Sequence, residues 1–460
     1  MNHTINPIPS SFRDPSGFLF VQNQTLYRAI TNFYKEDYDF LMESGLYQDL
    51  IEEELLISHR EVENVSQENS FYKIIQPEKI PFISYSYEWT FSQLKDAALL
   101  TLAIQKKALA YGMTLKDCSA YNIQFRNGKC IFIDTLSFER YQPGTPWVAY
   151  LQFCQHFLAP LALMAYTDIR LNQLIKIYTN GIPLDLARCL LPVYTYVISS
   201  LLMHIHMHAR FQEKYSTKRI NRHKFFMGLN SFRGLIDSLE GGIKRLRVGK
   251  RSSPWTRYYE TNHYSPIALQ HKSQIVADFI EKTRPQTVWD LGANTGLFST
   301  MAASSGALVI AFDVEPACIE VLYHQSRESK QINLLPLVLD ITNPSQSLGW
   351  AHKERLSLVE RGPADFVLAL ALVHHLRIAG NIPFKNIAAF FRKIARILVI
   401  EFIPKSEEEV QRLLTVRADI FSDYSRGQFE EEFNRYFRIE ETVPLRDSQR
   451  ILYLMHRNND

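Results

Sequence analysis

The sequence predicts a mixed α/β chain whose C-terminal part is a Rossmann-like, doubly wound sheet and whose N-terminal part is an α+β domain. Three observations lead to this prediction. Residues 287–296, TVWDLGANTG, read as a strand, a tight glycine-containing turn and the beginning of a helix. Apolar runs then alternate with helical segments as far as residue 402, which is typical of a parallel sheet. Upstream of residue 215, short apolar runs and longer helical stretches occur in mixed order.

The whole chain has the composition of a globular protein with more than one domain. Of its 460 residues, 46% are hydrophobic and 22% are charged, so we expect two or three domains with sizeable cores. The net charge of +3 gives no global argument for a nucleic-acid partner. Five scattered cysteines without C-x-x-C spacing favour reduced thiols over a disulfide framework or a zinc site. Without a basic-then-apolar leader or an apolar run of membrane-spanning length, we expect a cytoplasmic protein with no membrane span.

The expected N-terminal elements follow in chain order. Residues 1–15 read as a loose arm, and residues 16–215 read as one α+β domain that ends in helices rich in leucine, alanine and aromatic residues. The expected strands are 17–21, 25–30, 71–75 and 82–85, and the expected helices are 32–54 and 92–111.

The segment after the second helix, LKDCSAYNIQFRNGKCIFID, is the most informative part of this domain. Asp117 is followed by Asn122, then by a hairpin-like stretch at 123–133, and then by Asp134. This order resembles the catalytic loops of protein kinases and aminoglycoside phosphotransferases. The resemblance implies that Asp117 orients an acceptor hydroxyl, and that Asn122 and Asp134 bind Mg²⁺ at the phosphates of a nucleotide.

Several kinase motifs are missing around this loop. The domain has no G-x-G-x-x-G loop and no V-A-I-K lysine, for which Arg28 and Lys73 are candidate substitutes. The histidine before Asp117 is absent, and Thr-Leu rather than Phe-Gly follows Asp134. We therefore expect a degenerate kinase-like domain. The alternative is an ordinary hairpin in which Asp117 and Asn122 cap turns.

Two further features lie between the two parts of the chain. His204, His206 and His208 lack the intervening glutamate of a zinc protease, so we expect packed or surface histidines and no metal site. Residues 210–257 hold 13 basic and 3 acidic residues, a local balance of +10. We expect 216–255 to be a basic, partly helical connector, either a solvated linker or a surface for an anionic partner such as RNA, an acidic carrier or a phosphorylated substrate. No RNA-reading motif supports a nucleic-acid partner.

The last domain, 256–460, alternates helices and strands after a first helix at 265–283. The expected strands are 287–290, 308–313, 335–339, 365–370, 396–402, 436–441 and 450–456, and the expected helices between them are 296–304, 316–328, 351–360 and 383–395.

Acidic residues end the first strands of this domain. Asp290 ends the first strand, and Gly292, Asn294 and Gly296 form a turn that brings backbone N–H groups and a helix N-terminus toward a ligand. Asp313 ends the next strand, 21 positions after Gly292, about the spacing at which a Rossmann-type unit places a carboxylate on a ribose diol. Asparagine tolerates the left-handed backbone that such a turn requires. An NAD(P)-type turn or a structural loop would have the same appearance.

These residues resemble the first motif of the class I S-adenosylmethionine (SAM)-dependent methyltransferases, Asp/Glu-x-Gly-x-Gly-x-Gly, with Asn294 in place of the middle glycine. The resemblance implies that SAM is the cofactor, that the motif holds its methionine part and that Asp313 holds its ribose. It further implies that Asp340 accepts from the adenine amino group, with the Ile341 N–H beside it. Asp340 is alternatively a helix cap. The sheet of this family often ends with a strand pair whose last strand is antiparallel, and we expect the same here.

A second likeness to this family follows the fourth strand, in the segment ALVHHL. Similar Leu-x-His-His segments lie at the mouth of the site in several small-molecule methyltransferases. His375, or His374, is therefore suited to take a proton from a methyl acceptor, or instead to hold the loop. Glu401, at the end of the fifth strand, is also near the expected mouth.

Together the resemblances imply a SAM-dependent methyltransferase whose kinase-like domain recognises a substrate or partner. The two-part layout is similar to a bacterial methyltransferase group that includes nodulation-associated proteins. A small-molecule or glycan-type acceptor is favoured, and RNA and protein stay open. Two other functions also stay open: a phosphotransferase that uses Asp117, Asn122 and Asp134 with SAM as a sensor ligand, and a non-catalytic SAM-binding scaffold.

Overall fold

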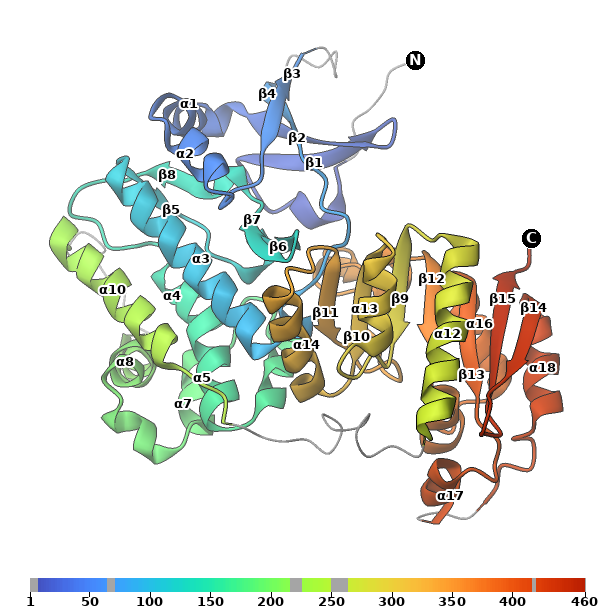
Figure 1. The fold of residues 1–460 in the computed structure, drawn as a ribbon. Coiled ribbons are helices and arrows are strands. Elements are labelled where there is room, and N and C mark those ends of the chain that lie inside the picture. The colour runs from blue at the N-terminus through green and yellow to red at the C-terminus, as the bar shows by residue number, and fades with distance from the viewer. Residues whose placement is uncertain (1–6, 64–70, 216–225, 250–263, 416–418, 460) are drawn as a thin grey trace. The chain divides into compact units, whose positions relative to one another are not determined.

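The computed structural model divides into two compact units, whose elements are labelled in Figure 1. Unit 1 contains Met1–Lys250 and the separate segment Ser347–Arg355, and unit 2 contains Arg251–Gln346 and Leu356–Asp460. The structure describes residues 7–63, 71–215, 226–249, 264–415 and 419–459. Parts of the predicted arm and of the predicted connector therefore lie outside the described residues.

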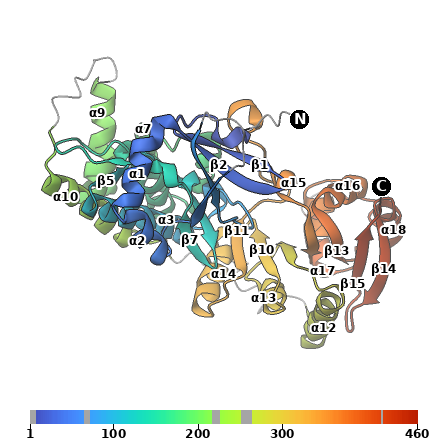
Figure 2. The ribbon, with the colours of Figure 1, turned by 90° about the horizontal axis from the view of Figure 1, so that it is seen from above.

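Unit 1 begins with a four-stranded antiparallel sheet in the order β1-β2-β4-β3, whose first two strands are labelled in Figure 2. The first two strands, both predicted, form a hairpin that turns at Asn23 and Gln24, which both have positive φ. The strands are β1 (Gly17–Gln22), β2 (Thr25–Thr31), β3 (His59–Val62) and β4 (Phe71–Pro77).

The strand predicted at 82–85 is wrong. The backbone N–H and C=O of Ser84 pair with the side chain of Gln124 rather than with a neighbouring strand. A 3-10 turn, η3 (Ser86–Glu88), follows at once. The remaining strand of the sheet is β3, which the sequence pattern did not reveal.

A left-handed glycine and a capping box set the boundaries of the first helices of unit 1. The helix predicted at 32–54 is divided at Gly45, whose φ of 83° is left-handed. The two pieces are α1 (Lys35–Glu43) and α2 (Leu46–Glu52). The long helix α3 (Phe91–Ala110) begins with a capping box, in which Thr90 and Gln93 each bond the backbone N–H of the other.

The predicted hairpin is formed by β6 and β7, joined by a turn at Asn127 and Gly128, with φ of 52° and 72°. The Ile133 N–H bonds the Asn122 carbonyl at the base of this hairpin, which brings its two ends together. The short strands here are β5 (Met113–Leu115), β6 (Ile123–Arg126), β7 (Lys129–Phe132) and β8 (Phe138–Arg140).

Helices and helical turns make up the remainder of unit 1. They are α4 (Tyr150–Phe153), η6 (Cys154–Leu158), α5 (Ala159–Tyr166), η7 (Ile169–Gln173), α6 (Leu174–Ile177), α7 (Leu184–Leu190), η8 (Val193–Val197), α8 (Ser199–Leu201), η9 (Leu202–Met207), α9 (His208–Tyr215) and α10 (Leu229–Arg245). The shortest turns are η1 (Pro9–Ser11), η2 (Asn32–Tyr34), η4 (Ala120–Asn122) and η5 (Thr135–Ser137).

Helix α10 lies within the predicted connector, yet it packs on α3. Lys106 of α3 forms ion pairs with Asp237 at 2.6 Å and Glu240 at 2.5 Å. Lys95 donates to the carbonyls of Lys244 and Leu246, at the end of the helix. This described part of the connector therefore belongs to unit 1.

Unit 2 is built on a seven-stranded sheet in the order β11-β10-β9-β12-β13-β15-β14. The first five strands in this order are parallel, and β15 is antiparallel to both of its neighbours. The strands are β9 (Thr287–Leu291), β10 (Leu308–Asp313), β11 (Leu334–Val338), β12 (Ala364–Ala369), β13 (Ala395–Phe402), β14 (Phe437–Pro444) and β15 (Ile451–Arg457). This is the order of the class I methyltransferase fold, with the expected antiparallel last strand.

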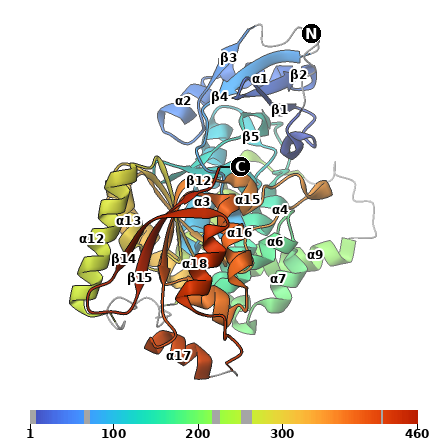
Figure 3. The ribbon, with the colours of Figure 1, turned by 90° about the vertical axis from the view of Figure 1, so that its right-hand side faces the viewer.

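Helices cover both faces of this sheet. Figure 3 shows α12 and α13 on one face and α16 and α18 on the other. The helices and helical turns of unit 2 are α12 (Pro266–Thr283), α13 (Leu297–Ser304), α14 (Pro316–Glu328), α15 (Leu358–Arg361), η13 (His375–Ala379), α16 (Phe384–Ile394), α17 (Glu408–Thr415) and α18 (Arg426–Asn434). The turn η12 (Trp350–His352) lies in the segment Ser347–Arg355, which belongs to unit 1. No described helix is long and apolar enough to cross a membrane.

The helix predicted at 351–360 is wrong. Leu348 and Arg355 form an isolated bridge, so the chain reverses there instead of coiling continuously. The reversal begins at Gly349 (φ 83°), and helix α15 starts later, capped by Ser357.

Candidate functional site

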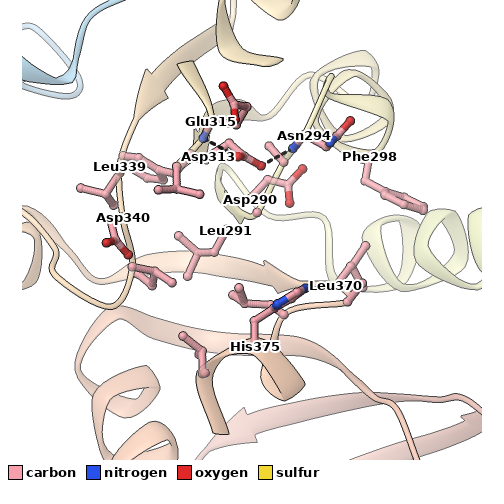
Figure 4. Close-up of a pocket in the computed structure, with 18 of the residues that line it drawn as sticks. Asp290, Leu291, Asn294, Phe298, Asp313, Glu315, Leu339, Asp340, Leu370 and His375 are labelled. Atoms are coloured by element: carbon pink, nitrogen blue, oxygen red, sulfur yellow. Dashed lines mark hydrogen bonds between the residues drawn. The ribbon is translucent and has the colours of Figure 1, made fainter. Parts of the chain in front are cut away.

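A cavity of about 290 Å³ lies at the carboxyl ends of the parallel strands of unit 2 (Figure 4). Doubly wound sheets bind their ligands at this edge, where the strand order reverses. The volume is close to the lower end, roughly 300 Å³, of ordinary small-molecule sites. The predicted site residues that line the cavity are Asp290, Gly292, Asn294, Asp313, Asp340, Ile341 and His375.

The turn after β9 is shaped by Gly292, Asn294 and Gly296, which have φ of 83°, 51° and 85°. A Cβ on Gly292 would make only an ordinary contact with Leu372, at 3.7 Å, so its φ of 83° rather than a lack of space favours glycine at this position. A Cβ on Gly296 would come within 2.2 Å of Leu322, so this glycine lets α14 pack against the turn and does not itself line the cavity. Asn294 adopts the left-handed conformation that the resemblance requires at its position.

Asp313, the last residue of β10, is fixed by the backbone of two neighbouring loops. Its Oδ2 accepts from the Asn294 N–H at 2.8 Å, and its Oδ1 accepts from the Glu315 N–H at 2.9 Å (Figure 4). Burial raises the pKa of Asp313, and these backbone donors oppose the rise. A carboxylate oxygen has capacity for a second donor, so both oxygens suit the two hydroxyls of a diol.

Asp290 lies beneath the turn and is 2% exposed. Its Oδ2 accepts from the Ser299 hydroxyl at 2.6 Å. Burial raises the pKa of Asp290 to about 6; the Ser299 hydrogen bond opposes this rise, and the charge of Asp313 adds to it.

Asp290 gives unit 2 a pH-dependent stability of definite sign. The pKa of Asp290 is about 6 in the folded protein and 3.8 in its ordinary state. The stabilising contribution of Asp290 to the free energy of unfolding is therefore fully present below about pH 4 and is lost as the pH rises through 6. We expect Asp290→Asn to stabilise the ligand-free protein at pH 8, by at most about 2–3 kcal/mol, and not at pH 4. Thermal unfolding of both proteins at the two pH values measures the difference. An equal effect at both pH values would contradict this origin.

Asp340 follows β11 and closes a turn rather than a helix. Its Oδ1 accepts from the N–H of Thr342 at 2.8 Å and from the hydroxyl of Thr342 at 2.7 Å. Figure 4 shows Asp340 at the opposite end of the labelled group from Phe298. Asp340 and Ile341 thus both contribute to the cavity wall.

The two histidines after β12 have different surroundings. His375 lines the cavity, whereas His374 is buried outside it, with its ring 4.2 Å from that of His375. Burial lowers the pKa of His375; the charge of Glu409 opposes this shift and that of Arg412 adds to it. A neutral imidazole facing the cavity is the state that a general base requires.

Lys272 of α12, a cavity-lining residue, was missed in the sequence. Its Nζ donates to Glu401 Oε2 at 2.7 Å and to the Tyr264 hydroxyl at 2.9 Å, and its side chain is 3% exposed. The signal was present in the sequence, because Lys272 stands among the apolar residues Ala268, Ile275 and Val276 on the buried face of the helix.

Glu401 connects this lysine to the loop that carries His375. Its Oε2 also accepts from the Ala371 N–H at 2.7 Å, and its Oε1 accepts from the Tyr264 hydroxyl at 2.7 Å. Burial opposes the charge on Glu401, but Lys272 and Arg450 hold its pKa below the usual value. The fully buried Glu401 therefore fixes the backbone at the cavity wall instead of standing free at its mouth.

Unit 1 brings the kinase-like residues Asp117, Asn122 and Asp134 together. Asp117 Oδ1 accepts from the Ser119 N–H and from Gln152 Nε2, both at 2.8 Å, which closes a turn. Asn122 Nδ2 donates to the Ser137 hydroxyl at 3.1 Å, and that hydroxyl donates to Asp134. The turn-capping alternative and the kinase-like arrangement are thus both present in the geometry.

An arginine forms an ion pair with Asp134, the carboxylate that the kinase resemblance assigns to a metal ion. Arg28 of β2 pairs with Asp134 through Nη1 and with Asp14 through Nη2, the latter at 2.7 Å. Lys73, the other candidate for the missing lysine, instead pairs with Glu61 at 2.5 Å. Arg28 therefore neutralises Asp134 without a bound cation.

The clustered histidines of unit 1 are packed against other side chains. The ring nitrogens of His204 lie 2.7 Å from the Tyr150 hydroxyl and 2.9 Å from that of Ser238. His206 Nε2 lies 2.9 Å from the Thr195 hydroxyl. Across the described ranges, no group of three or more His, Cys, Asp or Glu side chains is placed to hold a metal ion.

One relative matches nearly the whole chain. Nodulation protein NoeA from Rhizobium meliloti (strain 1021) is 34% identical over 465 residues, which cover 98% of this chain and 96% of that protein. No protein-family model matches the chain.

Two similar solved structures each match 44% of the chain. WbdD, described as a bifunctional kinase-methyltransferase, matches 44% of this chain and 42% of its own at 16% identity, with a TM-score of 0.30. This chain thus spans less than half the length of WbdD. The magnesium protoporphyrin IX methyltransferase ChlM from Synechocystis PCC 6803, solved with bound SAH, is 16% identical over 44% of this chain and 93% of its own, with a TM-score of 0.32.

Proposed function

The chain belongs to the family of nodulation protein NoeA, and we propose that its unit 2 transfers a methyl group from SAM to a hydroxyl of a small-molecule or glycan-type acceptor. The proposal rests above all on one observation. The acids at or after the ends of three adjacent parallel strands, Asp290, Asp313 and Asp340, line one cavity at the edge of the sheet where such folds bind ligands.

The cavity residues fit the parts of SAM in order. The bare turn at Gly292 suits close approach of the methionine part, and the two oxygens of Asp313 suit the ribose diol. Asp340 and Ile341 then suit the adenine edge, with one acceptor and one backbone donor. The buried Lys272 is a cation near the turn, where the methionine carboxylate of the cofactor would lie.

Little covalent chemistry is required of the protein. When bound, SAM would supply a methyl group on a positively charged sulfur, for transfer to the acceptor oxygen with the sulfur–carbon bond electrons left on the departing sulfur. His375 takes the proton that the acceptor hydroxyl loses. Leu370, Leu372 and Leu376, which also line the cavity, exclude water from the reacting atoms.

Unit 1 is proposed to recognise the acceptor or a partner. The Arg28 pair leaves Asp134 already neutralised, and a protein cation here opposes the binding of Mg²⁺. This observation favours recognition over phosphoryl transfer in unit 1.

The test follows methyl transfer from radiolabelled SAM into the small-molecule and carbohydrate fractions of an extract of cells lacking the protein. His375→Ala is expected to slow this transfer roughly 10²- to 10⁴-fold and to leave SAM affinity unchanged. His324→Ala, on the exposed side of α14, is the matched control and is expected to retain the wild-type rate. An unchanged rate in His375→Ala would reduce His375 to a loop residue, and no labelled product with wild-type protein would contradict the proposed reaction.

A further inference from the structure

Exposed apolar side chains gather on one helical part of unit 1. Of the 21 large hydrophobic side chains that are exposed in the described ranges, seven lie between residues 190 and 211. We call these seven the apolar surface: Leu190, Val193, Tyr194, Val197, Met203, Met207 and Phe211. Val193 and Val197 are 83% and 86% exposed, so they protrude rather than line a groove.

The elements that carry the apolar surface are packed together. Helix α7 contacts η9 and α9, η8 contacts η9, and Figure 3 shows α7 and α9 side by side. The Tyr196 ring of η8 stacks on His206 of η9, with centroids 3.8 Å apart. Met203 and Met207 are one helical turn apart and therefore share a face. The seven side chains thus belong to one continuous region of unit 1.

The core of unit 1 does not need these side chains. The same elements turn Ala187, Ile205 and Ala209 inward, and all three are 0% exposed. The elements therefore have a filled inner face and a second face whose apolar side chains are exposed among the described residues. An exposed apolar patch is typical of a docking site.

Arginines are present in the same part of unit 1 as the apolar surface. Burial lowers the pKa of His206, and the charges of Arg188 and Arg210 lower it further. Arg210 also lies 5.8 Å from the Tyr196 ring. Burial raises the pKa of Tyr166, and the charge of the exposed Arg245 opposes this rise. The Tyr166 ring lies 6.2 Å from the ring of Tyr194.

Basic residues outnumber acidic ones on the elements that carry the apolar surface. The sequence of α7, η8, η9 and α9 holds three basic residues, Arg188, Arg210 and Lys214, and two acidic residues, Asp185 and Glu213. Protruding apolar side chains among cations complement a layer of negative headgroups above a hydrocarbon interior.

We propose that the apolar surface docks unit 1 on the headgroup region of an anionic phospholipid membrane. Val193, Val197 and Met207 enter the boundary between headgroups and acyl chains, and the arginines contact lipid phosphates. A lipid surface needs no shape-matched pocket, which suits side chains that protrude singly. The proposal is independent of methyl transfer in unit 2, and attachment of this kind requires no spanning helix.

Vesicle co-sedimentation of the full chain tests the proposal. Vesicles of equal parts phosphatidylcholine and phosphatidylglycerol are compared with vesicles of phosphatidylcholine alone. The wild-type protein is expected to sediment with the mixed vesicles and to bind the neutral ones at least roughly tenfold more weakly. The variant Val193→Asp/Val197→Asp is expected to bind the mixed vesicles at least roughly tenfold more weakly than wild type. Arg210→Glu/Arg245→Glu is expected to lose a similar factor.

The matched control is Val21→Asp/Phe33→Asp, which adds the same two charges at exposed apolar positions elsewhere in unit 1. It is expected to bind like wild type, and thermal unfolding checks that all variants are folded. Equal binding of wild type to both vesicle types, or an equal loss in the control, would overturn the proposal. A self-associating wild-type chain that Val193→Asp/Val197→Asp makes monomeric would assign the surface to a second copy instead.

Discussion

Replacing Asp313 with alanine is expected to weaken SAM binding roughly 30- to 150-fold, equivalent to about 2–3 kcal/mol. The carboxylate lies at the end of β10 with one backbone donor on each oxygen, so its direction is fixed before a ligand arrives. A preset carboxylate can accept both hydroxyls of a ribose without losing side-chain freedom. Calorimetric titration of SAM into wild type and variant measures the change.

Two controls distinguish a loss of SAM affinity in Asp313→Ala from a loss of folding. Asp278→Ala removes an exposed carboxylate from α12 and is expected to bind SAM like wild type. Thermal unfolding shows whether Asp313→Ala retains its fold, which is needed because Asp313 also bonds the Asn294 N–H. Wild-type affinity in a folded Asp313→Ala protein would contradict the assigned ribose contact.

Replacing Glu401 with leucine is expected to destabilise unit 2 by about 3–5 kcal/mol. The substitution leaves the Lys272 ammonium buried without its carboxylate, and it removes the acceptor of the Ala371 N–H. The double variant Lys272→Met/Glu401→Leu removes both charges and is expected to recover most of the loss, since well-packed apolar pairs often replace buried ion pairs at little cost. Urea unfolding of the two single variants and the double variant gives the coupling free energy.

An exposed ion pair in the same unit provides the control. Lys282 pairs with Glu441 at the surface, with side chains 47% and 39% exposed. Glu441→Leu is expected to cost less than about 1 kcal/mol, because water screens the pair. If Glu401→Leu costs no more than this control, the buried network does not hold the cavity wall.

The sequence predicted the turn and the strand ends that line the cavity of unit 2, because the signals for them are local. The turn around Asn294 needs left-handed residues at fixed spacing, and Asp313 follows directly from the end of an apolar strand. Six of the seven predicted cofactor residues line the cavity, and Gly296 shapes the turn beside them. Their individual roles with a ligand stay predictions.

The remaining features depend on partners that are distant in the chain. Lys272 and Glu401 are 129 positions apart, and Arg28 and Asp134 are 106 apart, so neither pair leaves a periodic pattern. The wrong strand at 82–85 has the same cause, since the side chain of Gln124 takes the backbone bonds of Ser84. The periodicity of a sequence indicates which face of a helix or strand is apolar, but not which polar group a side chain will bond.

Calorimetric titration of the purified full chain with SAM, and then with NAD⁺ and with Mg²⁺-ATP, tests the central claim most directly. The account predicts that SAM binds with one site per chain, that this binding is weakened in Asp313→Ala, and that neither of the other ligands produces binding heat. Binding of NAD⁺ without SAM would assign the cavity to a different cofactor. Binding of Mg²⁺-ATP that is lost in Asp134→Ala, with no binding of SAM, would contradict the account and place the chemistry in unit 1.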